Sequence, residues 1–197
     1  MKKIAAIALA GITAMSVATV QADTFVGLVA GSHSADMQTP KGLKGTNNNF
    51  DNIIKNDGMY GIRVGQQNDG YRFYATYDNA SNSYRQYKAR QENLTVSLDK
   101  TFDIGSGGTQ LFAGATSGIT KLTHESKGVS RDSDMGYAMG LQAGIVQQLS
   151  SNFSVEGGYR YMRHNAKVDV KDRVEGNVGS SKLKSSDTWF LSANYHF

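Results

Sequence analysis

The sequence predicts an all-β protein, an eight-stranded antiparallel transmembrane β-barrel that follows a cleaved signal peptide. Three observations lead to this prediction: an apolar N-terminal segment with a basic start, an apolar–polar alternation of period two, and connections that alternate between short and long. The chain has 197 residues, with 22 Gly, one Pro and no Cys. That length is room for one main domain, and the lack of Cys excludes disulfides and thiolate metal sites.

Residues 1–22 are predicted to be a secretory signal peptide. Lys2 and Lys3 form a basic start, a mostly apolar run follows, and the small residue Ala22 closes the segment. These are the three parts of a secretion signal, whereas a retained membrane helix needs a longer run. Cleavage after Ala22 leaves residues 23–197 as the barrel domain. It removes two of 21 basic residues and leaves 19 against 17 acidic ones, a net of +2. That is too little charge to predict a nucleic-acid partner.

The first four strands are predicted over residues 24–32, 58–67, 71–78 and 91–100. In the first, both faces are small or apolar. The other three have one apolar and one polar face, as side chains of a strand alternate between faces: Tyr60, Ile62 and Val64 against Gly61, Arg63 and Gly65; Tyr71, Phe73, Ala75 and Tyr77 against Arg72, Tyr74, Thr76 and Asp78; Leu94, Val96 and Leu98 against Thr95, Ser97 and Asp99.

The last four strands are predicted over residues 109–120, 135–147, 153–162 and 188–197. The fifth strand again has small or apolar residues on both faces. The sixth and seventh alternate over their full length: Tyr137, Met139, Leu141, Ala143 and Ile145 against Ala138, Gly140, Gln142 and Gly144; Phe153, Val155, Gly157, Tyr159 and Tyr161 against Ser154, Glu156, Gly158, Arg160 and Met162. The eighth ends the chain.

The connections between these strands alternate in length. They are short after the second, fourth and sixth strands, at residues 67–70, 104–108 and 149–152, and long and polar after the others. This places every tight turn at one end of the sheet, as in transmembrane barrels with short periplasmic turns and longer extracellular loops. A secreted β-sandwich would also alternate, but it would not explain this asymmetry.

The polar faces carry charges that are predicted to lie inside the barrel, because a membrane barrel turns its apolar residues toward lipid. The predicted lumen charge network consists of Arg63, Arg72, Asp99, Glu156 and Arg160. Arg63 and Glu156 each lie about five residues from a short turn, so we expect them to pair across the lumen with Arg160 nearby. An unpaired buried charge costs several kcal/mol, and glycines four apart on this face leave room for long side chains. The expected interior is a filled structural core; a gated pore is the alternative.

The C-terminal segment resembles the assembly signal of Gram-negative outer-membrane barrels, because Trp189, Leu191, Tyr195 and Phe197 share one face and the chain ends at Phe. Residues 58–65 and 153–161 also resemble strands of small OmpA-like barrels. The chain after the signal peptide thus resembles the OmpA/OmpX/Ail-like class. The resemblance implies a place in the cell outer membrane of a Gram-negative bacterium. Outer-membrane lipid, lipopolysaccharide and the barrel assembly machinery are the implied partners.

The resemblance implies a non-enzymatic surface protein whose extracellular loops mediate adhesion, colonisation or another host interaction. The candidate contacts with host surface or matrix molecules are basic residues near the last long connection: Lys167, Lys171, Arg173, Lys182 and Lys184. Val168 and Val170 in that connection predict a hairpin that extends above the membrane. One alternative is a structural or narrow-channel, porin-like barrel that supports envelope integrity. The other is a lipid A-modifying enzyme.

No catalytic residue, metal site or cofactor is predicted. The four histidines are His33, His124, His164 and His196, and none has the spacing of a metal-ligand pair. His124 with Ser126, or His164 with Ser154, are the pairs that an enzyme could use, but no family motif surrounds them. His196 is expected to face the lumen near the periplasmic end, away from the outer leaflet where lipid A lies.

Overall fold

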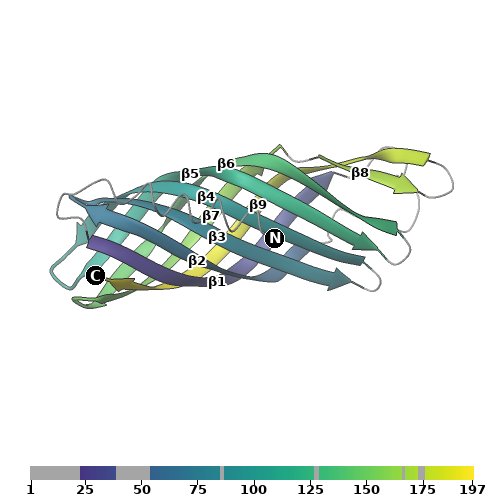
Figure 1. The fold of residues 1–197 in the computed structure, drawn as a ribbon. Helices are drawn as coiled ribbons and strands as arrows, with labels where there is room; N and C mark the ends of the chain where they lie inside the picture. Colours follow the sequence, from purple (N-terminus) through teal and green to yellow (C-terminus); the bar gives the residue numbers. More distant parts are fainter. Residues whose placement is uncertain (1–22, 39–53, 85–86, 127–128, 166, 173–175) are drawn as a thin grey trace.

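The computed structural model describes residues 23–38, 54–84, 87–126, 129–165, 167–172 and 176–197, and it is a closed antiparallel β-barrel (Figure 1). The strands are β1 (Asp23–Gln38), β2 (Ile54–Asn68), β3 (Tyr71–Tyr84), β4 (Tyr87–Ile104), β5 (Thr109–Ser126), β6 (Val129–Ser150), β7 (Phe153–His164), β8 (Lys167–Asp172) and β9 (Gly176–His196). Strands β1 to β7 pair in order, β7 pairs with β9, and β9 pairs back with β1. Eight strands therefore form the ring, as predicted, while β8 pairs with β9 outside it. The predicted signal peptide, residues 1–22, lies outside the described residues.

The strands extend further from the short turns than the sequence predicted. The sequence predicts a long connection between the strands 71–78 and 91–100, but β3 and β4 continue to pair there, with Ser81 opposite Arg90 and Tyr84 opposite Tyr87. In this part of the strands both faces carry polar residues, so the apolar–polar alternation that predicts a strand is absent. The backbone pairing does not depend on that pattern, because each added residue continues the hydrogen-bonded ladder.

The three short turns lie at one end of the barrel, together with the C-terminus (Figure 1). The first turns through Asp69 and Gly70, at φ of 46° and 75°, in the left-handed region that Gly and Asp tolerate. Neighbouring turns are joined to the adjacent strand: the Thr101 amide donates to the Gly70 carbonyl at 2.7 Å, and the His196 amide to the Asn152 carbonyl at 2.9 Å. Backbone hydrogen bonds therefore connect the turns at this end to the neighbouring strands.

Large apolar side chains cover the outer wall of the barrel. Leu28, Tyr137 and Leu191 are 70%, 73% and 71% exposed, which in a soluble protein would be a liability and in a lipid bilayer is the requirement. Exposed aromatic side chains lie near the short-turn end and again higher on the wall: Tyr71, Phe102, Phe153 and Phe197, then Tyr60, Tyr137 and Trp189. Among the described residues no helix is long and apolar enough to cross a membrane.

The C-terminal strand closes the ring. Residues of β9 pair with β1 from Phe25 opposite His196 to Gln38 opposite Lys182. The last residue takes part, because the Phe197 amide donates to the Thr24 carbonyl at 2.9 Å. The ring of Phe197 also packs edge-on against Tyr195, with centroids 5.1 Å apart. The backbone groups along this seam are paired except for a register shift between Asp36 and Met37, and this pairing is what the bilayer interior cannot supply.

Candidate functional site

The barrel interior nearest the short turns holds a charge network, which we call the lower lumen network: Arg63, Arg72, Tyr74, Asp99, Gln142 and Glu156. Glu156 accepts hydrogen bonds from Arg63 Nη1 at 2.9 Å and from Arg72 Nη1 at 2.8 Å. Arg72 Nη2 also reaches Asp99 Oδ2 at 2.8 Å. All four side chains are buried. The structure thus brings together Arg63 and Glu156, the pair expected from the sequence, and links them to two more predicted lumen charges.

Two residues that the sequence did not single out complete this network. The Tyr74 hydroxyl donates to Asp99 Oδ2 at 2.9 Å, and Gln142 Nε2 lies 2.7 Å from Asp99 Oδ1. The Tyr74 ring also lies under the Arg63 guanidinium, 4.9 Å from its centroid. The signal was present in the alternation, since both residues fall on the polar face of their strands. Their partners could not be identified from spacing, because they come from different strands.

Aromatic rings enclose the two arginines. The Arg63 guanidinium lies 5.2 Å from the centroid of Phe190, and that of Arg72 lies 4.6 Å from the centroid of Phe112. Phe25 packs on Tyr74 from a third direction, with ring centroids 5.9 Å apart. Cation–π contacts in a desolvated setting add to the ion pairs. The interior at this level is therefore occupied by paired charges and stacked rings.

Arg160 lies in a second cluster, the upper lumen network, further from the short turns. Its Nη2 contacts Asp78 Oδ2 at 2.7 Å, and Asp78 Oδ1 accepts from Asn93 Nδ2 at 2.6 Å. The expected position of Arg160 beside the Arg63–Glu156 pair is thus replaced by a separate ion pair. The reason is the strand geometry: Arg160 is four residues beyond Glu156 on the same face, which places it higher in the lumen.

Two histidines belong to the upper lumen network. His33 lies 2.8 Å from the Thr188 hydroxyl and 3.2 Å from Gln91 Oε1. His164 lies 2.7 Å from the Ser186 hydroxyl and 3.0 Å from that of Thr120. These contacts are satisfied polar pairs between neighbouring or facing strands.

The enzyme pair considered from the sequence is not formed. Ser154 lies 2.9 Å from His196 Nε2, at the short-turn end, and not beside His164. The side chains of His124 and Ser126 lie outside the described residues. Within the described part of the chain, no group of three or more His, Cys, Asp or Glu side chains is placed to hold a metal ion.

Inward-facing glycines leave the space that the charged side chains occupy. A Cβ at Gly114 would collide with Asp99, and one at Gly27 would collide with Asn194 and lie 3.1 Å from Arg63 Cγ. At Gly158, a Cβ would lie 2.8 Å from Phe190 and 2.9 Å from Phe112. The glycine spacing seen in the sequence therefore accommodates the network in a lumen of only eight strands.

The end opposite the short turns carries the β8–β9 hairpin, in which Lys167 is opposite Lys182 and Val168 is opposite Ser181. The hairpin projects past the barrel (Figure 1), as the valine pattern predicted. Of the candidate loop contacts, Lys167, Lys171 and Lys182 are in its strands and Lys184 is exposed just below it. The side chains of those three hairpin lysines, and Arg173 as a whole, lie outside the described residues.

Comparison with models of known protein families finds no match, and comparison with characterised protein sequences finds none either. Solved structures do match. Outer membrane protein H of Pseudomonas aeruginosa is 48% identical, over 89% of this chain and 99% of that one, with a TM-score of 0.59. Neisserial surface protein A is 15% identical, over 88% of this chain and 97% of that one, with a TM-score of 0.62. Ail of Yersinia pestis, solved in complex with a heparin analogue, is 13% identical, over 90% of this chain and 100% of that one, with a TM-score of 0.56. The last two share the fold alone.

Proposed function

This chain belongs to the family of small outer-membrane β-barrels that includes outer membrane protein H, and on that premise we propose that it is a non-enzymatic surface protein that binds through its extracellular end. Its location is the outer membrane of a Gram-negative bacterium. The observation that carries the proposal is the filled lumen, in which Arg63, Arg72 and Arg160 are all paired and buried. A lumen of this kind serves as a rigid support, so binding falls to the segments above it.

The β8–β9 hairpin is the best candidate for the binding element. It projects beyond the ring at the end opposite the short turns, which is the extracellular end in barrels with short periplasmic turns. Residues 163–187 carry six Lys or Arg and four Asp or Glu, an excess of two positive charges. Anionic polymers such as acidic host glycans are the chemistry that such a segment favours. We therefore assign adhesion, or another contact with host molecules, as the function. The heparin analogue in the Ail structure is a ligand of Ail; the proposal here stands on this chain's own hairpin.

The test is an adhesion assay on cells that display the full protein. Binding to heparin-coated and to neutral dextran-coated surfaces is measured for the wild type, for a variant with residues 166–181 replaced by a short turn, and for Lys167→Gln with Lys171→Gln and Lys182→Gln. We expect both variants to lose most of the heparin binding while the barrel still assembles. Lys121→Gln, on the outer wall, is the matched charge control. Equal heparin binding in all of these cells would refute adhesion through the hairpin.

A second candidate function is stabilisation of the envelope through lipopolysaccharide. Arg163 and Lys184 are exposed on the side of Trp189 away from the short turns, and exposed aromatic residues such as Trp189 are typical of the membrane interface, where lipid phosphates lie. Cations at a membrane surface attract anionic headgroups by about 1 kcal/mol each. If this is the function, cells with Arg163→Gln and Lys184→Gln take up a hydrophobic dye faster than the wild type and than Lys121→Gln cells. Uptake that does not change would remove this candidate.

A further inference from the structure

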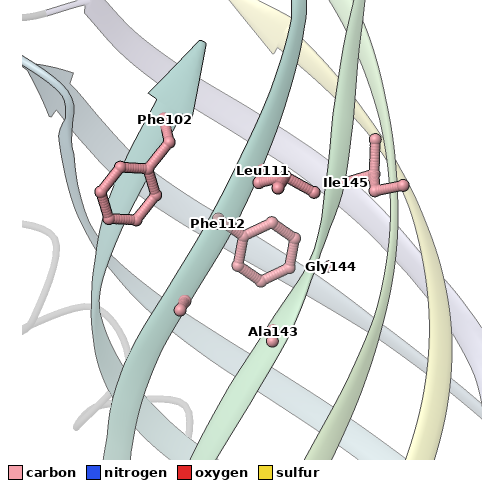
Figure 2. Close-up of a pocket in the computed structure, with 7 residues that line it drawn as sticks. Phe102, Leu111, Phe112, Ala143, Gly144 and Ile145 are labelled. Carbon is pink, nitrogen blue, oxygen red and sulfur yellow. The ribbon is translucent and has the colours of Figure 1, made fainter. Parts of the chain in front are cut away.

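The outer wall of the barrel carries an apolar groove close to the short-turn end. It has a volume of about 450 Å³ and is lined by Phe102, Leu111, Phe112, Ala113, Ala143, Gly144 and Ile145. Figure 2 shows Phe102 on one side and Ile145 on the other, with the Phe112 ring and Gly144 between them. The groove thus has large side chains as walls and small residues as its floor.

The pairing of three strands builds this groove. Leu111 of β5 is opposite Phe102 of β4 and Ile145 of β6, while one step higher Ala113 is opposite Ala143. The outer wall therefore carries large side chains at Leu111 and its partners, and only methyl groups at Ala113 and Ala143. Phe102, Leu111 and Ile145 are about half exposed, and they face the lipid because their neighbours in sequence face the lumen. A groove with these apolar lining residues can take up part of a hydrocarbon chain.

A cation lies next to one residue of the groove lining, close to the short-turn end. Lys100 is directly opposite Ala113 in the β4–β5 pair, on the same outward face. Its ammonium lies 4.0 Å from the centroid of Tyr71 and beside Gly70 of the first short turn. No described carboxylate lies within ion-pair distance of it. Among the described residues it is the only cation on the outer wall at this end, where Asp23, Asp69 and Asp103 are the charged neighbours.

We propose that this surface is a binding site for an anionic glycerophospholipid of the periplasmic leaflet, with one acyl chain in the groove and the phosphate on the Lys100 ammonium. Two independent features agree on this occupant. The groove accepts a chain and excludes polar groups, while Lys100 supplies the single positive charge at the height where a headgroup emerges from the bilayer. A zwitterionic lipid would gain the chain contact but less from the cation.

The test uses the full mature chain, refolded in detergent and titrated with phosphatidylglycerol or with phosphatidylcholine of the same chains. Native mass spectrometry counts the lipids bound to each barrel. We expect the wild type to prefer phosphatidylglycerol. Lys100→Gln is expected to bind phosphatidylglycerol about fivefold more weakly, which is the effect of one cation near a membrane surface. Ala113→Phe fills the groove and is expected to weaken the binding of both lipids.

Two matched controls separate the site from the rest of the wall. Lys121→Gln removes an outward cation in the extracellular half of β5, and Ala30→Phe adds a ring on β1, across the barrel from β5. Both should bind lipid like the wild type. Equal lipid counts and equal headgroup preference in all five proteins would overturn the proposal. The proposal would also be overturned if the wild type had the mass of a dimer and Ala113→Phe had the mass of a monomer. The groove would then be an interface between copies of the chain.

Discussion

Glu156 is the residue on which the lower lumen network depends, because two arginines share its carboxylate. It contacts Arg63 and Arg72 at 2.9 and 2.8 Å in a fully buried setting. Arg72 has a second carboxylate partner in Asp99, but Arg63 has no other among the ion pairs of the described residues. Removing the negative charge would therefore leave at least one buried guanidinium without compensation.

Glu156→Gln is expected to lower the free energy of unfolding by about 3–5 kcal/mol, the usual cost of removing one partner of a buried ion pair. Urea unfolding of the refolded barrel in lipid vesicles, followed by the fluorescence of Trp189, measures it. Asp103→Asn is the control, since Asp103 is exposed and accepts a hydrogen bond from the exposed Gln110 side chain. A Glu156→Gln barrel as stable as the wild type would mean that water or other groups compensate the arginines.

Gly114→Ala and Gly157→Ala form a pair that tests the packing of the lumen. A Cβ at Gly114 points inward and meets Asp99 and the Leu98 carbonyl, whereas one at Gly157 points outward and meets only Leu191 Cδ2, at 3.3 Å. We expect Gly114→Ala to destabilise the barrel by about 1–3 kcal/mol through overpacking. Gly157→Ala should change little, because a flexible side chain can yield. The urea unfolding midpoints of the two variants and the wild type are compared. A similar loss of stability in both variants would contradict a filled lumen.

At the scale of a single element, β9 closes the barrel and carries the predicted assembly signal. The residue after its end, Phe197, donates its amide to the Thr24 carbonyl and packs edge-on against Tyr195. Deleting Phe197 removes both contacts at the seam where β1 and β9 meet. We expect the deletion to lower the folded fraction in the outer membrane several-fold, as measured by the heat-dependent mobility of the barrel on gels.

Phe197→Tyr is the matched variant for this deletion. It keeps the backbone hydrogen bond and an aromatic ring, so it should assemble almost as well as the wild type. If the deletion assembles as well as Phe197→Tyr, the terminal residue is dispensable and the signal lies in Trp189, Leu191 and Tyr195. The present structure explains why the seam needs pairing, and the role in recognition by the assembly machinery stays a prediction.

At the scale of the whole molecule, the two lumen networks and their aromatic neighbours decide between a support and a channel. The side chains of Arg63, Arg72, Tyr74 and Phe190 are all buried within the ring. An eight-stranded barrel has an interior just wide enough for side chains. We expect the refolded protein to show no steady single-channel conductance in planar bilayers, with a larger porin as the positive control. A reproducible, ion-selective conductance would instead favour the narrow-channel alternative.

The sequence by itself determined the fold class and the two faces of the sheet. Alternation with period two separates lipid-facing from lumen-facing residues, as Tyr60 and Ile62 against Arg63 illustrate, because the side-chain period of a strand is fixed by its geometry. Asn, Asp, Gly and Ser in the short connections predicted the tight turns for the same local reason. The position of Arg63 and Glu156 relative to those turns was enough to predict their pairing.

The tertiary structure alone decided which residues meet. The register of the closed ring places Arg160 against Asp78, brings Tyr74 and Gln142 to Asp99, and sets Lys100 opposite Ala113 of the groove. These contacts join different strands, some consecutive and some far apart in the sequence, and periodicity gives the face of a residue but not its partner. The outward extension of β3 and β4 was likewise decided by backbone pairing, which continues past the point where the hydrophobic pattern ends.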